Sequence, residues 1–273
     1  MDVVTPNGFE DDFVWSGKEF DEKRAEARRA MIRVAEATLN CTFDGEPVII
    51  GTSGRYEFRN KGIDIFLDAL KQLAESDALG REVLAYITVP AATTGPRKDL
   101  QAHLADETSP IDLKQNRFCT HYLEHPEWDQ ILNSINGSTL ADPSSKVKVV
   151  FVPTYLNGRD GIFDKSYYEL LVGMDMTLFP SYYEPWGYTP LESTAFSVPT
   201  LTTTLAGFGL WAGAQGEHEG VELIARNDDN YAEAAREIAK SLLRFTQYTP
   251  QEIEIARNAA AELSRTALWS ELY

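Results

Sequence analysis

Two glutamates and a glycine stand out in the stretch SYYEPWGYTPLES, residues 181–193. Glu184 lies directly before a proline, inside a loop, where a carboxylate is costly unless it is solvated or used for binding. Gly187 lets the backbone approach a ligand without a side chain in the way. Carboxylates beside Tyr and Trp rings are one way to hold a sugar, with hydroxyls on the carboxylates and C–H groups on the ring faces. The alternative is that the aromatic residues only pack the loop.

The second glutamate belongs to a predicted helix start. Thr189, Pro190 and Glu192 spell a T-x-x-E capping box with proline at the first helical position, which predicts Thr189 as the N-cap. The free N–H groups of such a helix carry partial positive charge and favour a phosphate-bearing ligand. Glu192 could also serve only to close the capping box. A glycosidase-like pair of catalytic carboxylates is disfavoured, because Glu192 is committed to the helix start and no water-activating partner is evident.

A second loop, GTSGRYEFRNKGID at residues 51–64, offers two cations. Arg55 and Lys61 are flanked by Gly54 and Gly62, and two cations at a strand end predict a diphosphate site in a chain whose net charge is −17. The alternative is a solvated turn with surface bases. The glycines fit neither G-x-G-x-x-G nor G-x-x-x-x-G-K-[ST], so neither a dinucleotide fingerprint nor a P-loop is present.

Alternating apolar runs and helix-period segments must position these loops. Buried strands are predicted at residues 47–53, 82–90, 146–153, 176–180, 198–204 and 221–225. Helices are predicted at residues 63–73, 128–135, 166–172 and 190–196, and throughout the chain after residue 228, where Thr249 and Glu252 form another capping box. This order predicts an α/β fold: a doubly wound, mostly parallel, Rossmann-like sheet with helices on both faces and a helical C-terminal segment. Ligands in such sheets bind beyond the carboxyl ends of the strands, here the loops after residues 53, 153, 180 and 204. Residues 91–115 are polar and weakly periodic, and we expect them to form an excursion from the sheet.

Composition excludes several classes of protein. The acidic surface argues against nucleic acid and anionic membranes as partners. Cys41 and Cys119 give no disulfide framework, and His121 and His125 are four apart but lack a third ligand, so we expect no metal and no cofactor. We see no signal peptide and no apolar run near the roughly 18 residues of a membrane span. The sequence therefore predicts a cytoplasmic protein.

Both loops resemble the signature loops of one family. GRYEFRNKGIDIFLDAL (54–70) and FPSYYEPWGYTPLES (179–193) resemble those of glycogen synthases of the fungal and animal type, glycosyltransferase family 3. VTPNGF (4–9), VKVVFVPTYLNGRDGIFDKSYYELLVGMD (147–175) and ARNAAAELSRTALWSEL (256–272) also follow the family pattern. The likeness covers nearly the whole chain, and its two loops are long and specific.

The resemblance implies the C-terminal, donor-binding domain of a GT-B glycosyltransferase over residues 1–273. Such an enzyme transfers glucose with retention from UDP-glucose to the non-reducing end of an α-1,4-glucan. ADP-glucose stays open as donor, because bacterial glucan synthases of another family use adenosine. The acceptor-binding domain would lie upstream of Met1, so we expect the isolated chain to be inactive. Another GT-B glucosyltransferase, or a non-catalytic module that binds nucleotide or glucan, is the alternative, and the oligomeric state is open.

The resemblance also implies a role for each site residue. Arg55 and Lys61 would lie on the donor phosphates, Glu184 near the transferred glucose, Glu192 on the ribose hydroxyls and Tyr167 against the base. The backbone at Gly187, Tyr188 and Thr189 would meet phosphate or sugar oxygens. Thr120 and His121 resemble a family "TH" pair without an assigned role. In the family mechanism the leaving phosphate itself assists the incoming hydroxyl, without a strong protein base.

One stretch departs from the family pattern. Fungal and animal members carry an arginine-rich late helix that senses glucose 6-phosphate, whereas SLLRFTQYTPQEIEIARNAAAEL (241–263) has only Arg244 and Arg257. A doubly charged sugar phosphate needs several convergent cations. We therefore predict no activation by glucose 6-phosphate.

Overall fold

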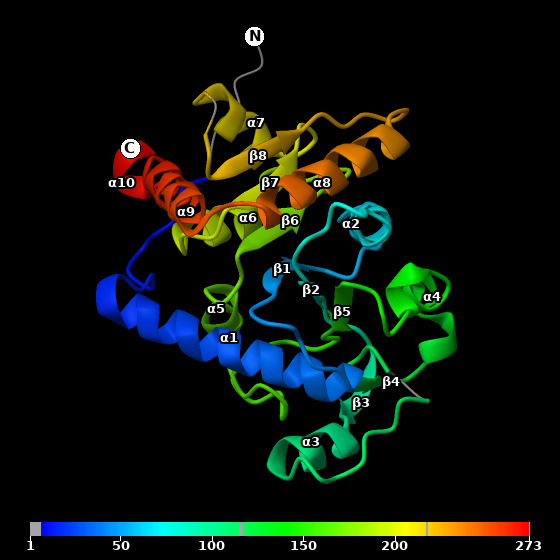
Figure 1. The fold of residues 1–273 in the computed structure, drawn as a ribbon. Coiled ribbons are helices and arrows are strands. Elements are labelled where there is room, and N and C mark those ends of the chain that lie inside the picture. The colour runs from blue at the N-terminus through cyan, green and yellow to red at the C-terminus, as the bar shows by residue number, and fades with distance from the viewer. Residues whose placement is uncertain (1–6, 115–116, 217, 273) are drawn as a thin grey trace.

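A six-stranded parallel sheet forms the centre of the computed structural model, which describes residues 7–114, 117–216 and 218–272 (Figure 1). Its strand order is β5-β2-β1-β6-β7-β8. The strands are β1 (Val48–Ser53), β2 (Val83–Thr88), β5 (Val147–Phe151), β6 (Met176–Phe179), β7 (Thr200–Thr203) and β8 (Val221–Ile224). All six predicted strands are confirmed. They could be predicted because strands covered on both faces have continuous apolar sequences. Of the family-like segment at residues 4–9, residues 4–6 lie outside the described residues.

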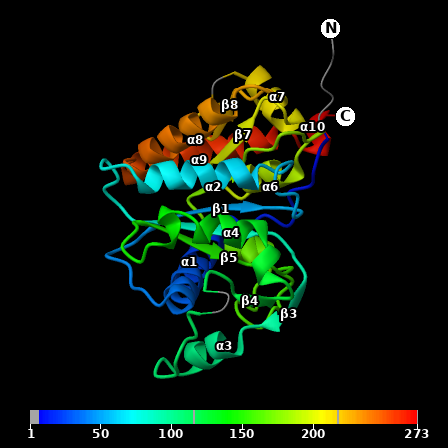
Figure 2. The ribbon, with the colours of Figure 1, turned by 90° about the vertical axis from the view of Figure 1, so that its right-hand side faces the viewer.

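Helices cover both faces of this sheet, as a doubly wound fold requires (Figures 1 and 2). Helices α2 (Ile63–Ala74), α4 (Gln130–Asn136) and α8 (Tyr231–Thr246) lie on one side. Helices α1 (Gly17–Leu39), α5 (Tyr167–Leu171), α6 (Tyr188–Ala195) and α9 (Pro250–Arg265) lie on the other. Helix α7 (Gly207–Ala214) precedes β8, and α10 (Trp269–Leu272) ends the described chain. The predicted helical C-terminal segment is confirmed, and Thr249 and Glu252 form their capping box at the start of α9.

Two parts of the fold were not predicted. Helix α1 was missed, although it buries Ala27, Met31 and Val34 against α5 and the sheet. The excursion after β2 is ordered as β3 (Thr93–Pro96), paired antiparallel with β4 (His121–Leu123), and as α3 (Lys98–Ala105).

A buried arginine fixes this excursion. The guanidinium of Arg97, which is fully buried, donates to both carboxylate oxygens of Asp99 (3.2 and 2.6 Å) and to the carbonyl oxygens of Cys119 and Asp112. Burial alone would raise the pKa of Asp99. Hydrogen bonds from Arg97 and from the Asp112 backbone outweigh that effect and lower the pKa to about 2.

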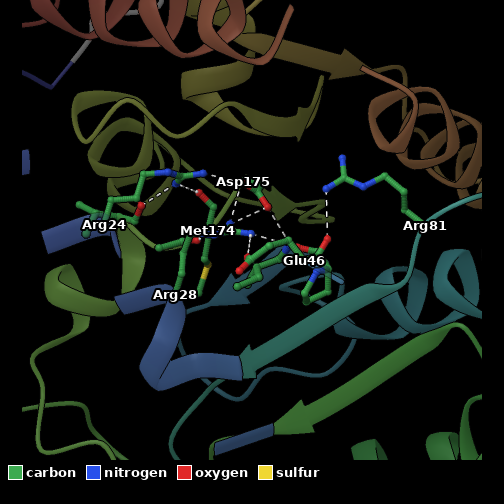
Figure 3. A network of polar contacts seen from close by, with 10 residues as sticks. Arg24, Arg28, Glu46, Arg81, Met174 and Asp175 are labelled. Carbon is green, nitrogen blue, oxygen red and sulfur yellow. Dashed lines mark hydrogen bonds and ion pairs between the residues drawn. The ribbon is translucent and has the colours of Figure 1, made fainter. Parts of the chain in front are cut away.

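A buried carboxylate joins α1 to the amino ends of the strands (Figure 3). Asp175, directly before β6, accepts hydrogen bonds from Arg24 (2.5 Å), from Arg28 (2.9 Å) and from the backbone N–H of Ile49 in β1 (2.9 Å). Arg28 also pairs with the exposed Glu46. The network connects helix and sheet on the edge opposite the loops after the strands.

Candidate active site

Two neighbouring cavities, of about 450 and 260 Å³, lie at the carboxyl ends of the strands, as predicted. The larger one is lined by residues that follow β1, β2 and β5, and the smaller one by residues at the ends of β1, β6 and β7. Ser53, Gly54, Arg55 and Thr189 line both. The two loops that carry the sequence signatures therefore form the wall between them.

An ion pair lines the smaller cavity. The Nζ of Lys61 donates to the Glu184 carboxylate, and the side chains are only 16% and 22% exposed. Glu184 is held by its backbone, because its N–H donates to Leu205 (3.3 Å) and its carbonyl accepts from Gly207 (3.0 Å). At Gly62, the loop that carries Lys61 closely approaches the backbone after β6, and an added Cβ would lie 2.0 Å from the Pro180 carbonyl oxygen. Only glycine fits there.

Helix α6 begins at this cavity, but earlier than predicted. Its N-cap is Gly187, with φ 114°, and its first residue is Tyr188, so the capping box predicted at Thr189 and Glu192 is wrong. The left-handed glycine turns the chain into the helix before Thr189 is reached. The backbone N–H groups of Gly187, Tyr188 and Thr189 have no hydrogen-bond acceptor among the described residues. Tyr188 and Thr189 line the smaller cavity together with Lys61, so their unpaired amides and the ammonium of Lys61 give it the character of an anion site.

Arg55 lies on the wall that the two cavities share, but it is held less firmly than Lys61. Its side chain is 77% exposed and pairs with Glu57 at 3.1 Å. The structure thus brings both cations of the loop to the smaller cavity, one mostly buried and one solvated.

The larger cavity contains Tyr167 and Glu192. The hydroxyl of Tyr167 forms a hydrogen bond with Ser53 Oγ at 2.7 Å, which fixes the ring at the end of β1. Glu192 Oε1 accepts from the Tyr168 hydroxyl at 2.9 Å, whereas Oε2 has no donor in the part of the chain that the structure describes. Burial raises the pKa of Glu192, and the bond from Tyr168 opposes that shift. Glu192 is therefore not used for capping.

Sequence reasoning missed Tyr168, whose only signal was its place beside Tyr167. Its ring stacks on Phe196 with centroids 5.0 Å apart and planes at 18°. This packing directs the hydroxyl to Glu192. The loop after residue 153, predicted to lie at the ligand site, does line the larger cavity, with Thr154, Tyr155, Leu156 and Asn157, whereas Thr88 and Pro90 at the end of β2 were missed.

Other residues singled out in the sequence lie away from the cavities. Trp186 is 5% exposed and packs against Phe208 and Trp211, so loop packing accounts for this ring. Thr120 and His121 are buried, with His121 Nε2 bound to the Asp160 carbonyl at 2.9 Å, and neither lines a cavity described above. Within residues 7–114, 117–216 and 218–272, no cluster of three or more His, Cys, Asp or Glu side chains could hold a metal ion. In those same residues, no helix is both long and apolar enough to cross a membrane.

Comparison with solved structures supports the fold assignment. A glycosyltransferase of lipopolysaccharide biosynthesis, WaaG, superposes with a TM-score of 0.51 at 16% identity over 98% of this chain and 53% of its own. HepE from Anabaena, solved in complex with UDP and glucose, gives 0.53 at 15% identity over 96% of this chain and 51% of its own. The likeness identifies the Rossmann-like half of a GT-B fold.

Sequence comparison identifies the family. A glycogen synthase from Neurospora crassa is 27% identical over 99% of this chain and 47% of its own length, and one from Caenorhabditis elegans is 28% identical over 99% and 49%. The rat liver enzyme is 27% identical over 99% and 46%. The chain thus spans about half the length of the curated relatives it matches. The family profile described as glycogen synthase matches residues 112–273, well over half of the sequence, and the chain belongs to the glycogen synthase family.

Proposed function

We propose that residues 1–273 are the nucleotide-sugar-binding, C-terminal half of a cytoplasmic glycogen synthase. The complete enzyme transfers glucose, with retention, from UDP-glucose to the non-reducing end of an α-1,4-glucan. The glucan binds through an acceptor domain outside this chain, so the chain alone does not elongate glucan. Membership of the glycogen synthase family and the position of both signature loops at one edge of the sheet support this assignment.

One observation carries the proposal. The mostly buried ammonium of Lys61 and the unpaired amides at the start of α6 converge on a single cavity of about 260 Å³. A diphosphate matches such a site in charge and in hydrogen-bond acceptors. Lys61 and Arg55 there stabilise the charge that develops on the leaving phosphate.

The adjoining cavity suits the nucleoside. Glu192, with its free oxygen, binds the ribose hydroxyls, and the Tyr167 ring lies against the base. Glu184 then faces the transferred glucose beside the diphosphate. Because Glu184 and Glu192 line different cavities, they do not flank one glycosidic bond in the manner of a hydrolase. The leaving phosphate, rather than a protein base, receives the proton of the incoming hydroxyl.

Calorimetry with UDP, UDP-glucose and ADP-glucose tests this function. We expect weak UDP binding to the 273-residue chain, abolished by Arg55→Ala and unchanged by Arg81→Ala, because Arg81 lines neither cavity and its guanidinium donates to the Glu46 carbonyl. If ADP-glucose binds more tightly than UDP-glucose, ADP-glucose is the donor instead. Absence of nucleotide binding would contradict the proposal, and so would glucan elongation by this chain alone.

Two alternatives have distinct signatures in the full-length protein. Another GT-B glucosyltransferase would consume the nucleotide sugar but leave glucan unextended. A non-catalytic module would bind UDP or glucan without turnover of any donor. Extension of a glucan primer by the full-length protein, with a new α-1,4 linkage, excludes both.

A further inference from the structure

A third cavity, of about 640 Å³, lies behind the loops that form the donor site. It opens between the first turns of α2 and α8 and shares no lining residue with the two cavities above. Only a short stretch of chain separates this cavity from the smaller cavity of the donor site, because Asn60 lines the one and its neighbour Lys61 lines the other. The N–H of Tyr182 donates to the Asn60 carbonyl at 2.8 Å and holds the two loops together there.

A buried arginine with unused donors lines this cavity. Arg226 is only 6% exposed, and its guanidinium makes one hydrogen bond, from Nη1 to the Pro180 carbonyl. Its other N–H groups have no acceptor in the described parts of the chain, and no described carboxylate lies within ion-pair distance of it. These N–H groups are accessible from the cavity, where they can donate hydrogen bonds to a ligand with hydroxyl or other oxygen acceptors.

An acceptor and aromatic faces accompany the arginine. Asp64 Oδ1 accepts from the N–H of Ile65 at 2.8 Å, but Oδ2 has no donor among the described residues. Burial raises the pKa of Asp64, while Arg226 acts in the opposite direction. Tyr182 is 40% exposed with its ring 5.3 Å from the Arg226 guanidinium, and Phe58 provides a second ring.

This set of groups discriminates between classes of ligand. The lining holds two cations, Arg59 and Arg226, and two carboxylates, Asp64 and Asp228, so it offers no net positive charge to an anion, and its charged groups disfavour a purely apolar guest. A sugar ring offers hydroxyls that both donate and accept, together with a C–H face for aromatic rings. We infer that this cavity is a second carbohydrate site, which binds a pyranose ring with its hydroxyls between Arg226 and Asp64 and its C–H face on Tyr182. The inference does not depend on the proposed transferase activity, because it uses no residue of the donor cavities.

Saturation-transfer NMR and calorimetry on the 273-residue chain test the inference, with UDP present to occupy the donor site. Glucose and maltoheptaose are the two sugar probes, and inorganic phosphate is the anion probe. Binding of glucose identifies a site for a free monosaccharide, whereas binding of maltoheptaose alone identifies a glucan site. We expect Asp64→Asn and Tyr182→Ala each to weaken sugar binding by about tenfold or more, because each removes a direct contact.

Two further variants sharpen the result. Tyr182→Phe keeps the ring and loses only the hydroxyl that bonds Asp228, so it should retain sugar binding. Tyr183→Ala removes a neighbouring ring that is 63% exposed and lines none of the three cavities, and it should leave sugar binding unchanged. A cooperative thermal unfolding transition in every variant reports that the chain is folded, independently of nucleotide binding.

The inference is overturned by any of three results. The first is that neither sugar binds at tens of millimolar. The second is that phosphate, but no sugar, binds and is lost in Arg226→Gln. The third is that sugar binds with equal affinity to the wild type, Asp64→Asn and Tyr182→Ala. Failure of UDP binding in the wild type would instead count against the proposed function and leave the sugar measurements interpretable.

Discussion

Replacing Glu184 by glutamine should tighten nucleotide binding while it abolishes glucosyl transfer. In the structure, Lys61 has Glu184 as its counter-ion inside a mostly enclosed cavity. A diphosphate that binds there has to share Lys61 with the carboxylate and is also repelled by it. Glutamine keeps the size of the side chain but removes the competing charge, so the ammonium of Lys61 becomes fully available to the phosphates.

The size of the effect follows from charge and distance. Two unit charges about 4 Å apart interact by about 4 kcal/mol at an effective dielectric constant near 20, and at about twice that distance by about half as much. Solvent in the open cavity screens this repulsion further. We therefore expect UDP to bind to Glu184→Gln more tightly by about 1–2 kcal/mol, or about tenfold.

Calorimetric titration of UDP into the wild type, the two single variants and the double variant isolates the interaction between Lys61 and Glu184. Lys61→Ala should weaken binding, and Glu184→Gln should still tighten it in the Lys61→Ala background, because the carboxylate also repels the diphosphate directly. The difference between the two Glu184→Gln effects measures the coupling between Lys61 and Glu184. Glu57→Gln is the matched control. It frees the exposed Arg55 in the same way, and screened surface pairs contribute little. In the full-length protein, Glu184→Gln should bind UDP and fail to extend glucan. If Glu184→Gln weakens UDP binding, the carboxylate supports the nucleotide rather than competing with it, and the assignment of Lys61 to the diphosphate fails.

Four further predictions concern the supporting structure. Tyr168→Phe should weaken UDP binding about fivefold in calorimetry, because it removes the hydrogen bond that positions Glu192 for the ribose hydroxyls. The loss should be smaller for 2′,3′-dideoxy-UDP, which has no such hydroxyls. Asp175→Ala should lower the free energy of unfolding in urea by about 3–5 kcal/mol, since it removes the buried carboxylate that pairs with the mostly buried Arg24 and Arg28. Glu46→Ala, at an exposed partner of Arg28, should change that free energy by less than about 0.5 kcal/mol. The pKa of Asp99 falls from its ordinary 3.8 to about 2 on folding. The stability that this carboxylate contributes is therefore complete above about pH 4 and is lost as the pH falls toward 2. The free energy of unfolding of Asp99→Asn should be lower than that of the wild type at neutral pH and should approach it near pH 2. Glucose 6-phosphate should not stimulate the full-length protein, and strong stimulation in a titration would contradict the reasoning from the sparse arginines of its late helix.

The sheet was predictable because its strands are local signals. Each central strand of a covered parallel sheet is a short apolar run, and runs such as 47–53 and 146–153 require no knowledge of their neighbours. Placing the ligand at the carboxyl edge followed from topology alone. The excursion after β2 was not predictable in the same way. Its order depends on the buried Arg97, whose acceptors include carbonyls that are distant in sequence and become its partners only after folding.

The two T-x-x-E sequences of this chain show where local rules fail. At Thr249 the motif forms its capping box, because the turn between α8 and α9 leaves Glu252 exposed and free to fold back onto the N-cap backbone. At Thr189 the same pattern has no such freedom. Gly187 starts α6 earlier, and Glu192 is held by Tyr168 at the wall of the larger cavity.

The failed motif has a chemical consequence. A capping box at Thr189 would have directed side-chain oxygens to the first N–H groups of α6 and so satisfied them within the chain. With Gly187 as N-cap, those N–H groups stay unpaired beside Lys61, and Glu192 keeps an oxygen for a second ligand group. Departures from local rules are expected where a protein binds its ligand, because a helix start that is already satisfied cannot bind phosphate. On this argument, Gly187→Ser would add a side-chain oxygen that competes for those amides, and it would strain a backbone at φ 114°. It should therefore weaken UDP binding more than Gly158→Ser does. Gly158 also has a positive φ, and an added Cβ there would meet no other atom within 4 Å.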